Sequence, residues 1–399
     1  MAEAAQRGFR YGHPDWANLG QGAPETGPLP GTLPRIAHVH VADADHEYAP
    51  VGGVPELRDA VAQLYNARHR RGMPTQYSAE NVAISAGGRT ALTRIAASLG
   101  NIHLGHVLPD YTAYEELLTI FRAFVPIPIV LDRADGFALT PARLRAEIVG
   151  KGLSAILLSN PCNPTGQVVR GGALRAWVDI ARQLQCALIF DEFYAHYLYD
   201  AAAMADGPAL SAARYVEDVD KDPVVVTDGL TKNWRYPGWR LAWTVGPKHV
   251  IERVISAGSF LDGGPAHPLQ KAAMPLLEPA LADQEARAIQ AVFGEKRLLM
   301  LERLRAMGLH VEPPPQGAFY CFASLEHLPP ELADGDHFFR AALAKNVIVV
   351  PGAFFDVNPG KRRSHIPSRM RQFVRLSFGP EINELRKGLD RLDVVVRGG

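Results

Sequence analysis

One segment predicts both the fold and the chemistry of this chain: Asp228-Gly-Leu-Thr-Lys-Asn-Trp-Arg-Tyr-Pro-Gly-Trp-Arg240. It directly follows the apolar run Pro223-Val-Val-Val-Thr227, which is typical of a buried strand. Lys232 therefore comes just after a strand, and Arg240 follows it by eight residues. A lysine amine must be partly neutral to attack a carbonyl carbon, which needs apolar surroundings or cationic neighbours. The tryptophans and arginines of this segment can supply both, so we expect Lys232 to be a nucleophile rather than a surface lysine.

Polar residues also follow two other predicted strands. The segment Asp191-Glu-Phe-Tyr194 comes directly after the apolar run Ala187–Phe190, and Asn160-Pro-Cys-Asn-Pro-Thr-Gly166 comes shortly after Ala155–Leu158. Ligands of open α/β sheets bind at the carboxyl ends of the strands, so these side chains are candidates for a binding site. A helix N-cap for Asp191 and a turn residue for Asn163 are the plain structural alternatives.

Strand and helix signals alternate from about residue 54 onward. The predicted strands are Val82–Ser85, Ala155–Leu158, Ala187–Phe190 and Pro223–Thr227, and one predicted helix carries Leu174, Trp177, Ala181 and Leu184 on one face. Strand, helix and strand at these spacings indicate right-handed crossovers and a mainly parallel sheet. The fold class is therefore α/β, with helices flanking that sheet.

The pattern changes near residue 280. A long helical stripe runs from Ile289 to Met307, and strand signals at Phe319–Phe322, Val347–Val350 and Val374–Phe378 predict a smaller α+β domain. We expect residues 1–45 to form an N-terminal arm that joins this small domain. Residues 46–280 then form the large domain, and residues 281–399 the small C-terminal domain.

Composition excludes several classes of function. The chain has 399 residues, with 42 Lys plus Arg against 42 Asp plus Glu, so its net charge of zero gives no general attraction to nucleic acid or anionic membranes. Three cysteines without paired spacing argue against a disulfide framework and fit a reducing cytoplasm. No secretory signal and no apolar run of about 20 residues is evident, so we expect a cytoplasmic protein without membrane contact. His38, His40 and His46 supply only one side of a metal site, and no metal is expected.

In combination, these segments resemble the fold-type I pyridoxal-phosphate enzymes of the class I/II aminotransferase family, from about residue 18 to residue 390. The resemblance implies an aspartate-aminotransferase-like fold in which the large domain binds pyridoxal 5'-phosphate. It implies that Lys232 holds this cofactor as an internal aldimine and later moves a proton between Cα and C4′. Asp191 is then the partner of the pyridinium nitrogen, and Tyr194 and Asn163 are donors to the 3′-oxygen.

The resemblance also assigns residues around the cofactor's phosphate and ring. Arg240 is the phosphate-binding arginine, while Gly88, Arg89 and Thr90 lie where a strand feeds a helix, a place that favours a dianion. Tyr111 matches the aromatic that stacks on the ring. Tyr48 resembles a tyrosine that reaches the phosphate of the neighbouring subunit, which implies a homodimer with shared active sites.

One glycine departs from the family pattern. Many relatives have a hydroxyl residue three positions before the lysine, where this chain has Gly229, so one phosphate contact is in question. The remaining alternatives are structural: Arg240 as a surface arginine and residues 87–90 as a plain turn between a strand and a helix.

For the substrate, Arg375 matches the arginine that grips the α-carboxylate, with Asn163 beside it and Gly22 in the segment that closes over the site. The resemblance therefore implies an aminotransferase that moves an amino group between an L-amino acid and a 2-oxo acid. A second hypothesis keeps the cofactor but oxidises, cyclises or eliminates from the quinonoid, as in specialised biosynthesis; Leu261-Asp-Gly-Gly264 hints at such a pocket. A third, an effector-binding domain of a transcription factor, would need a DNA-binding extension, for which we expect no room before residue 18. The amino donor stays open.

Overall fold

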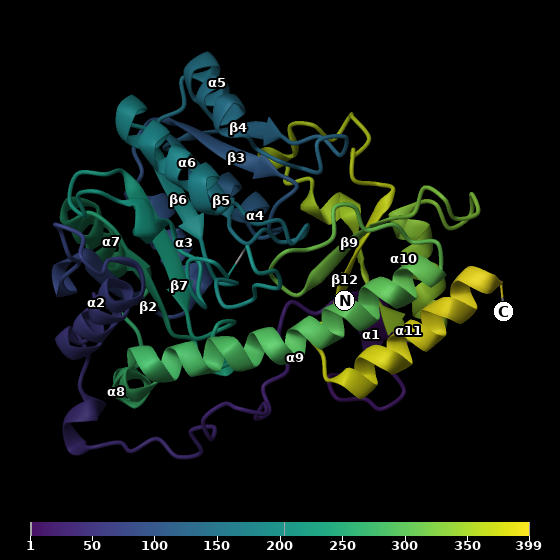
Figure 1. The fold of residues 1–399 in the computed structure, drawn as a ribbon, viewed down its shortest axis with the longest axis horizontal. Coiled ribbons are helices and arrows are strands. Elements are labelled where there is room, and N and C mark those ends of the chain that lie inside the picture. Colours follow the sequence, from purple (N-terminus) through teal and green to yellow (C-terminus); the bar gives the residue numbers. More distant parts are fainter. Residues whose placement is uncertain (1, 203, 399) are drawn as a thin grey trace.

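The computed structural model describes residues 2–202 and 204–398, and its centre is a seven-stranded sheet (Figure 1). Across the sheet the strands are β2 (Val82–Ser85), β8 (Ala242–Val245), β7 (Val224–Gly229), β6 (Ala187–Asp191), β5 (Ala155–Ser159), β3 (His103–Leu108) and β4 (Val125–Val130). Strand β8 is antiparallel to both of its neighbours, and the other adjacent pairs are parallel. The predicted α/β class with a mainly parallel sheet is confirmed.

Alternation of side chains along the strands fills two cores, one on each face of the sheet. On β6, Leu188 and Phe190 pack in one core, whereas Ile189 packs in the other. The first core is closed by α2 (Pro55–His69), α5 (Pro141–Lys151) and α6 (Gly171–Leu184), and the second by α3 (Gly88–Ser98), α4 (Tyr114–Ile120) and α7 (Lys248–Leu261). Because both faces are covered, the central strands are continuous apolar runs rather than alternating ones.

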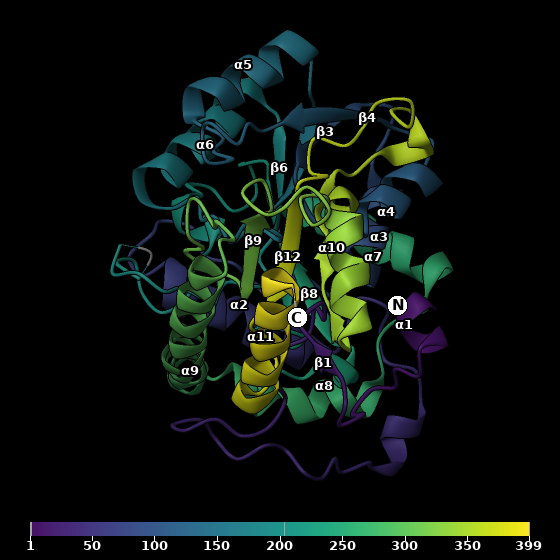
Figure 2. The ribbon, with the colours of Figure 1, turned by 90° about the vertical axis from the view of Figure 1, so that its right-hand side faces the viewer.

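The second half of the molecule is built on a smaller antiparallel sheet, in the order β11 (Val350–Pro351), β12 (Phe373–Ser377), β9 (Tyr320–Ser324). Helices α10 (Gly335–Ala344), α11 (Ile382–Arg397) and the C-terminal half of α9 (Pro279–Ala306) lie in front of it in Figure 2. The single strand predicted at Val347–Val350 is wrong. It is split into β10 (Val347–Ile348) and β11, because the first part pairs with the N-terminal segment and the second with β12.

The N-terminal segment joins this second half through β1 (Ala17–Asn18), which pairs with β10, while α1 (Ala2–Gln6) packs nearby. It then crosses below the large sheet as an irregular chain and reaches α8 (His267–Ala273) (Figure 1). Arg235 donates to the carbonyl oxygens of Glu25 and Gly27, at 3.2 and 2.6 Å, and so fixes this segment beside the lysine segment. The domain boundaries at residues 45 and 280 stay a prediction.

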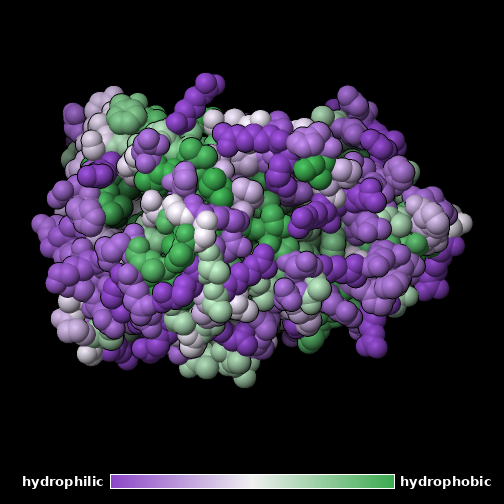
Figure 3. All heavy atoms as spheres, turned by 90° about the horizontal axis from the view of Figure 1, so that it is seen from above, coloured by the Kyte–Doolittle hydropathy of each residue, from purple (hydrophilic) through white to green (hydrophobic). Residues whose placement is uncertain are grey.

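Short 3-10 helices complete the described structure, at Asp43–His46, Ala79–Asn81, Ala212–Tyr215, Pro237–Trp239, Met274–Leu277, Gly352–Phe355 and Pro359–Lys361. In the face drawn in Figure 3, hydrophobic atoms gather in the left and middle parts, and the right-hand end is mainly hydrophilic. Of the helices in residues 2–202 and 204–398, none has the length and apolar character that a membrane crossing requires.

Candidate active site

A cavity of about 650 Å³ lies where strands β5, β6 and β7 end and the smaller sheet faces them. Most of the sequence-predicted site residues line it: Gly22, Gly88, Arg89, Tyr111, Asn163, Asp191, Tyr194, Lys232, Arg240 and Arg375. Two do not. The Thr90 hydroxyl points back to the carbonyl oxygen of Ala86, at 3.2 Å, and the Tyr48 side chain is almost fully exposed. The cavity therefore gathers residues from both halves of the chain.

Lys232 enters the cavity just after β7. Its Nζ donates to the carbonyl oxygen of Gly22, and the hydroxyl of Tyr197 holds its backbone carbonyl at 2.9 Å. Burial, followed by the charges of Arg375 and Arg240, lowers the pKa of the Lys232 amine to about 8. The neutral form of this amine is therefore far more populated near physiological pH than in an ordinary lysine, as a nucleophilic lysine requires.

Asp191 ends β6 with a buried carboxylate. The hydroxyl of Tyr114 donates to its Oδ2 at 3.0 Å, and the backbone N–H of Phe193 donates to its Oδ1 at 3.4 Å. Burial raises the pKa of Asp191 to about 6, and these hydrogen bonds and the charge of Lys232 oppose the rise. A carboxylate in such a place gains most from a cationic partner in the same cavity. Sequence reasoning missed Tyr114, whose contact spans 77 residues.

The N-terminal end of α3 faces Arg240 across a very close contact. A Cβ on Gly87 would lie 2.1 Å from Nη2 of Arg240, and Gly87 has a φ of +92°, so only glycine suits this position. The free backbone N–H groups at a helix start favour an anion. The Thr231 hydroxyl, which also lines the cavity, is buried without a hydrogen-bond partner. A phosphate group fits this donor set.

Gly229 explains why the expected hydroxyl before the lysine is missing. It pairs with Ala242 of the antiparallel strand β8, and a Cβ on it would lie 2.6 Å from both the Cα of Ala242 and the carbonyl oxygen of Leu241. A serine side chain has no room there. Thr231, two residues later, offers its hydroxyl instead, a donor that sequence reasoning did not single out.

Arg375, on β12, is buried at the far side of the cavity from α3. Its Nη1 donates to Oδ1 of Asn163 and its Nη2 to the carbonyl oxygen of Gly20, both at 2.8 Å. The guanidinium lies over the rings of Tyr320 and Phe355, at 4.1 and 4.9 Å from their centroids, and its Nε has no partner. No carboxylate pairs with it in the described part of the chain. A buried guanidinium without an acidic partner is suited to bind an anionic group such as a carboxylate.

The aromatic residues of the cavity are linked by their hydroxyl groups. Tyr194 and Tyr320 share a hydrogen bond of 2.9 Å between their hydroxyl oxygens, and Arg89 donates its Nε to the hydroxyl of Tyr111 at 3.4 Å. Tyr111 packs edge-on against Tyr114. Tyr320 was not predicted, because nothing in the sequence distinguishes it from a core tyrosine.

A buried network supports Asn163 from behind. The Ser159 hydroxyl donates to Oδ1 of Asp110 and accepts a hydrogen bond of 3.1 Å from the backbone N–H of Asn163. Burial raises the pKa of Asp110 to about 8. Cys162, next to Asn163, points to the carbonyl oxygen of Pro109 and does not line the cavity. Among the described residues, no group of three or more His, Cys, Asp or Glu side chains could hold a metal ion.

Comparison with known proteins gives a consistent result. The family model "Aminotransferase class I and II" matches residues 14–392. Among curated relatives, the aspartate aminotransferase of Sulfurisphaera tokodaii is 26% identical over 94% of this chain and 88% of that protein. The aspartate/prephenate aminotransferase of Thermus thermophilus is 28% identical over 91% of this chain and 86% of that protein. The solved structure of Thermus thermophilus aspartate aminotransferase with maleate has a TM-score of 0.79 at 26% identity and covers 99% of this chain and 94% of its own.

Proposed function

Because this chain belongs to the class I and II aminotransferase family, whose members use pyridoxal 5'-phosphate, we propose that Lys232 is the residue that binds the cofactor's aldehyde covalently. The chain is an aminotransferase. The observation that carries the assignment is the shared cavity, in which the Lys232 amine, the Asp191 carboxylate and the Arg375 guanidinium all line one space. When bound, the cofactor supplies an electron sink for the electron pair released at the substrate Cα.

Asp191 holds the ring end of the cofactor. Burial raises its pKa to about 6, and a protonated ring nitrogen held by this carboxylate would lower that pKa, since each opposite charge favours the charged form of the other. The Tyr114 hydroxyl fixes the orientation of the carboxylate. At the other end, Arg240, Thr231 and the start of α3 bind the phosphate.

Arg375 selects an amino acid and orients it. Its two Nη groups are held by Asn163 and Gly20, so the guanidinium is fixed before substrate arrives. A carboxylate bound to this fork has a fixed plane, which sets the direction of the Cα–H bond. Once the substrate's amino group has displaced it from the cofactor, the Lys232 amine would take the proton from Cα and deliver it to the cofactor's C4′ carbon, a role that its lowered pKa suits.

The active enzyme is a homodimer in this proposal, and Tyr48 of each subunit completes the site of the other. Tyr48 is 96% exposed and lies outside its own cavity. Val41 and Phe260 are further apolar side chains with large exposed fractions. Exposed apolar side chains of this kind are typical of a surface that another subunit covers.

The test combines location and activity. The cofactor-loaded enzyme is reduced with borohydride and digested, and mass spectrometry should find the pyridoxyl group on Lys232. Amino donors are then screened against pyruvate and 2-oxoglutarate as acceptors. A label on another lysine would overturn the assignment of Lys232. Ammonia or hydrogen peroxide released without any acceptor would instead indicate the oxidising or eliminating chemistry of the second hypothesis.

A further inference from the structure

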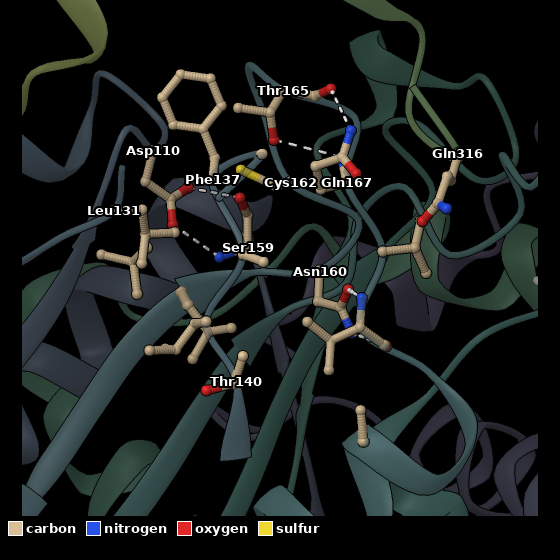
Figure 4. Close-up of a pocket in the computed structure, with 18 of the residues that line it drawn as sticks. Asp110, Leu131, Phe137, Thr140, Ser159, Asn160, Cys162, Thr165, Gln167 and Gln316 are labelled. Carbon is tan, nitrogen blue, oxygen red and sulfur yellow. Dashed lines mark hydrogen bonds between the residues drawn. The ribbon is translucent and has the colours of Figure 1, made fainter. Parts of the chain in front are cut away.

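A second cavity, of about 450 Å³, lies next to the candidate active site (Figure 4). The two cavities share one lining residue, Ser159. The second is bounded by residues from β3 and β5, the starts of α5 and α6, and Gln316 from the connection to β9. Its walls are mainly apolar and include Val107, Leu131, Phe137, Leu139, Leu158 and Trp177. This size falls in the range of small-molecule sites, about 300–1,000 Å³.

One buried donor in this cavity has no partner. Trp177, on α6, is 1% exposed, and its Nε1–H makes no hydrogen bond to the described residues. Other polar groups of the wall do have partners. Asn160 exchanges two hydrogen bonds of 2.9 Å with the backbone of Val169, and Thr140 caps α5 at Arg143. An unpaired buried donor is costly, so it marks a place where an acceptor is needed.

The cavity offers no free charge to an ionic ligand. Its one arginine, Arg170, already donates to Gln316 at 3.1 Å and pairs with Asp200 at 3.5 Å. Asp110 is buried, accepts two hydrogen bonds from Ser159, and its raised pKa favours the neutral carboxyl. An uncharged molecule therefore suits this lining better than an ion.

Two hydrogen-bonded routes connect the cavity to the candidate active site. The first runs from Asp110 through Ser159 to Asn163, which holds Arg375 at 2.8 Å. The second is the backbone N–H of Asp110, which donates to the carbonyl oxygen of Phe355 at 3.2 Å. Phe355 in turn packs on the guanidinium of Arg375. These contacts link Asp110 and Ser159, on the wall of the second cavity, to the guanidinium of Arg375.

We propose that this cavity, which we call the Trp177 cavity, binds an uncharged apolar molecule of one or two rings that accepts a hydrogen bond from Trp177. Its occupancy changes the affinity of the Arg375 site for the substrate carboxylate. The binding part is independent of the proposed function, and only the coupling part rests on it.

The experiment compares two probes of similar shape on the cofactor-loaded enzyme. Quinoline carries a ring nitrogen that accepts a hydrogen bond, and indole carries a ring N–H that donates one. Titration calorimetry without any amino donor should show saturable one-to-one binding of quinoline, and binding of indole at least several-fold weaker. Trp177→Phe removes the donor and should lower the affinity for quinoline to that for indole.

Ala173→Trp is the second variant, because Ala173 is exposed and lines the mouth of the Trp177 cavity. It should abolish quinoline binding and leave the basal transamination rate unchanged. Quinoline should also change the KM for the amino donor several-fold in the unaltered enzyme but not in Ala173→Trp. Equal binding by both probes, binding that survives Ala173→Trp, or simple competition with the amino donor would each overturn the proposal. Since calorimetry needs no turnover, a failed donor screen leaves this test intact.

Discussion

The candidate active site and the Trp177 cavity lie side by side and differ in their charged side chains. In the first these side chains are largely unpaired, and in the second they have partners. The first cavity brings Lys232, Asp191 and Arg375 together with little direct pairing among them. The charge of Arg375 lowers the pKa of Lys232 and that of Asp191 raises it, while the charge of Lys232 lowers the pKa of Asp191. The second, reached through the same Ser159, has its single arginine paired and its aspartate hydrogen-bonded. Unpaired buried charge is expensive, so it persists where a charged ligand later neutralises it.

The difference in unpaired charge indicates which of the two cavities is suited to catalysis. In the proposed function, each unbalanced group of the first cavity has a complementary part of the cofactor or substrate, whereas the buried group left unpaired in the second cavity is a neutral donor, Trp177 Nε1. The first is therefore suited to catalysis and the second to recognition. The predictions below test the candidate active site, which is the charged side of this comparison, from the largest expected effect to the smallest.

The largest effect is expected for Lys232→Ala. Removing the amine that exchanges the proton should lower the transamination rate by on the order of 10²–10⁴-fold or more. Stopped-flow measurement of the half-reaction with an amino donor checks this. Lys221→Ala, at a lysine on the surface, is the matched control and should keep full activity. An unaltered rate for Lys232→Ala would show that Lys232 takes no part in the proton transfer.

Arg375→Ala should raise the KM for the amino donor by on the order of 10²-fold, because two charged hydrogen bonds to the carboxylate are lost at about 1.5 kcal/mol each. The absorbance of the bound cofactor should not change. Arg371→Ala, an exposed arginine nearby, serves as the control. If kcat fell while KM stayed constant, the role of Arg375 in ground-state carboxylate binding would be refuted.

The pH dependence of cofactor uptake tests the charge imbalance directly. The lysine amine reacts when neutral, and the pKa of Lys232 is lowered to about 8. The rate of cofactor capture by the apoenzyme should therefore rise with pH and level off above about pH 8, after correction with free N-acetyl-lysine. Arg375→Met removes a neighbouring positive charge and should move the midpoint to higher pH. A midpoint near the ordinary lysine value of 10.5 in the unaltered enzyme would contradict the lowering of the Lys232 pKa by burial and neighbouring positive charges.

At the phosphate end of the cavity, substitutions of Gly229 test packing, and a substitution of Thr231 tests cofactor binding. Gly229→Ser and Gly229→Ala should both lower the free energy of unfolding, by about 1–3 kcal/mol, since the Cβ atom alone collides with β8. Thr231→Val should instead leave stability nearly unchanged and weaken cofactor binding about tenfold. Chemical denaturation and cofactor titration measure the two quantities. The interpretation fails if Gly229→Ser is as stable as the parent.

The smallest effect is expected for Tyr48→Phe, which should weaken cofactor binding several-fold through loss of one hydroxyl contact. Mixed dimers provide the sharper measurement. When Tyr48→Phe subunits are paired with Lys232→Ala subunits, one site per dimer regains both residues, and parent-like affinity should return to that site. If Tyr48 serves its own subunit, no mixed site recovers.

The motif residues could be predicted because each follows a strand with a clear apolar pattern. Asp191 ends β6 and Lys232 follows β7 after Leu230 and Thr231, so strand recognition alone put them at one edge of the sheet. Their partners could not be predicted. Tyr114 and Tyr320 come from distant segments and carry no local signal, and the interior of a fold decides which tyrosine meets which carboxylate.

The sequence pattern also failed where pairing, not propensity, sets the structure. Two prolines in Val125-Pro-Ile-Pro-Ile-Val130 argue against a strand in the sequence, yet this segment forms β4. The prolines are tolerated there because β4 is the edge strand of the sheet. The reversal of β8 and the split between β10 and β11 depend on which neighbour each strand finds. The Trp177 cavity lies among residues that look like ordinary core in the sequence.

The contact between Gly229 and β8 limits how cofactor binding could be strengthened by engineering. Two of the three atoms nearest to an added Cβ belong to the backbone of Leu241 and Ala242, so a serine at position 229 would need a shift of β8 itself rather than of a side chain. Thr231 already carries a hydroxyl that lines the cavity, so substitutions at position 231 can vary this group without moving a strand.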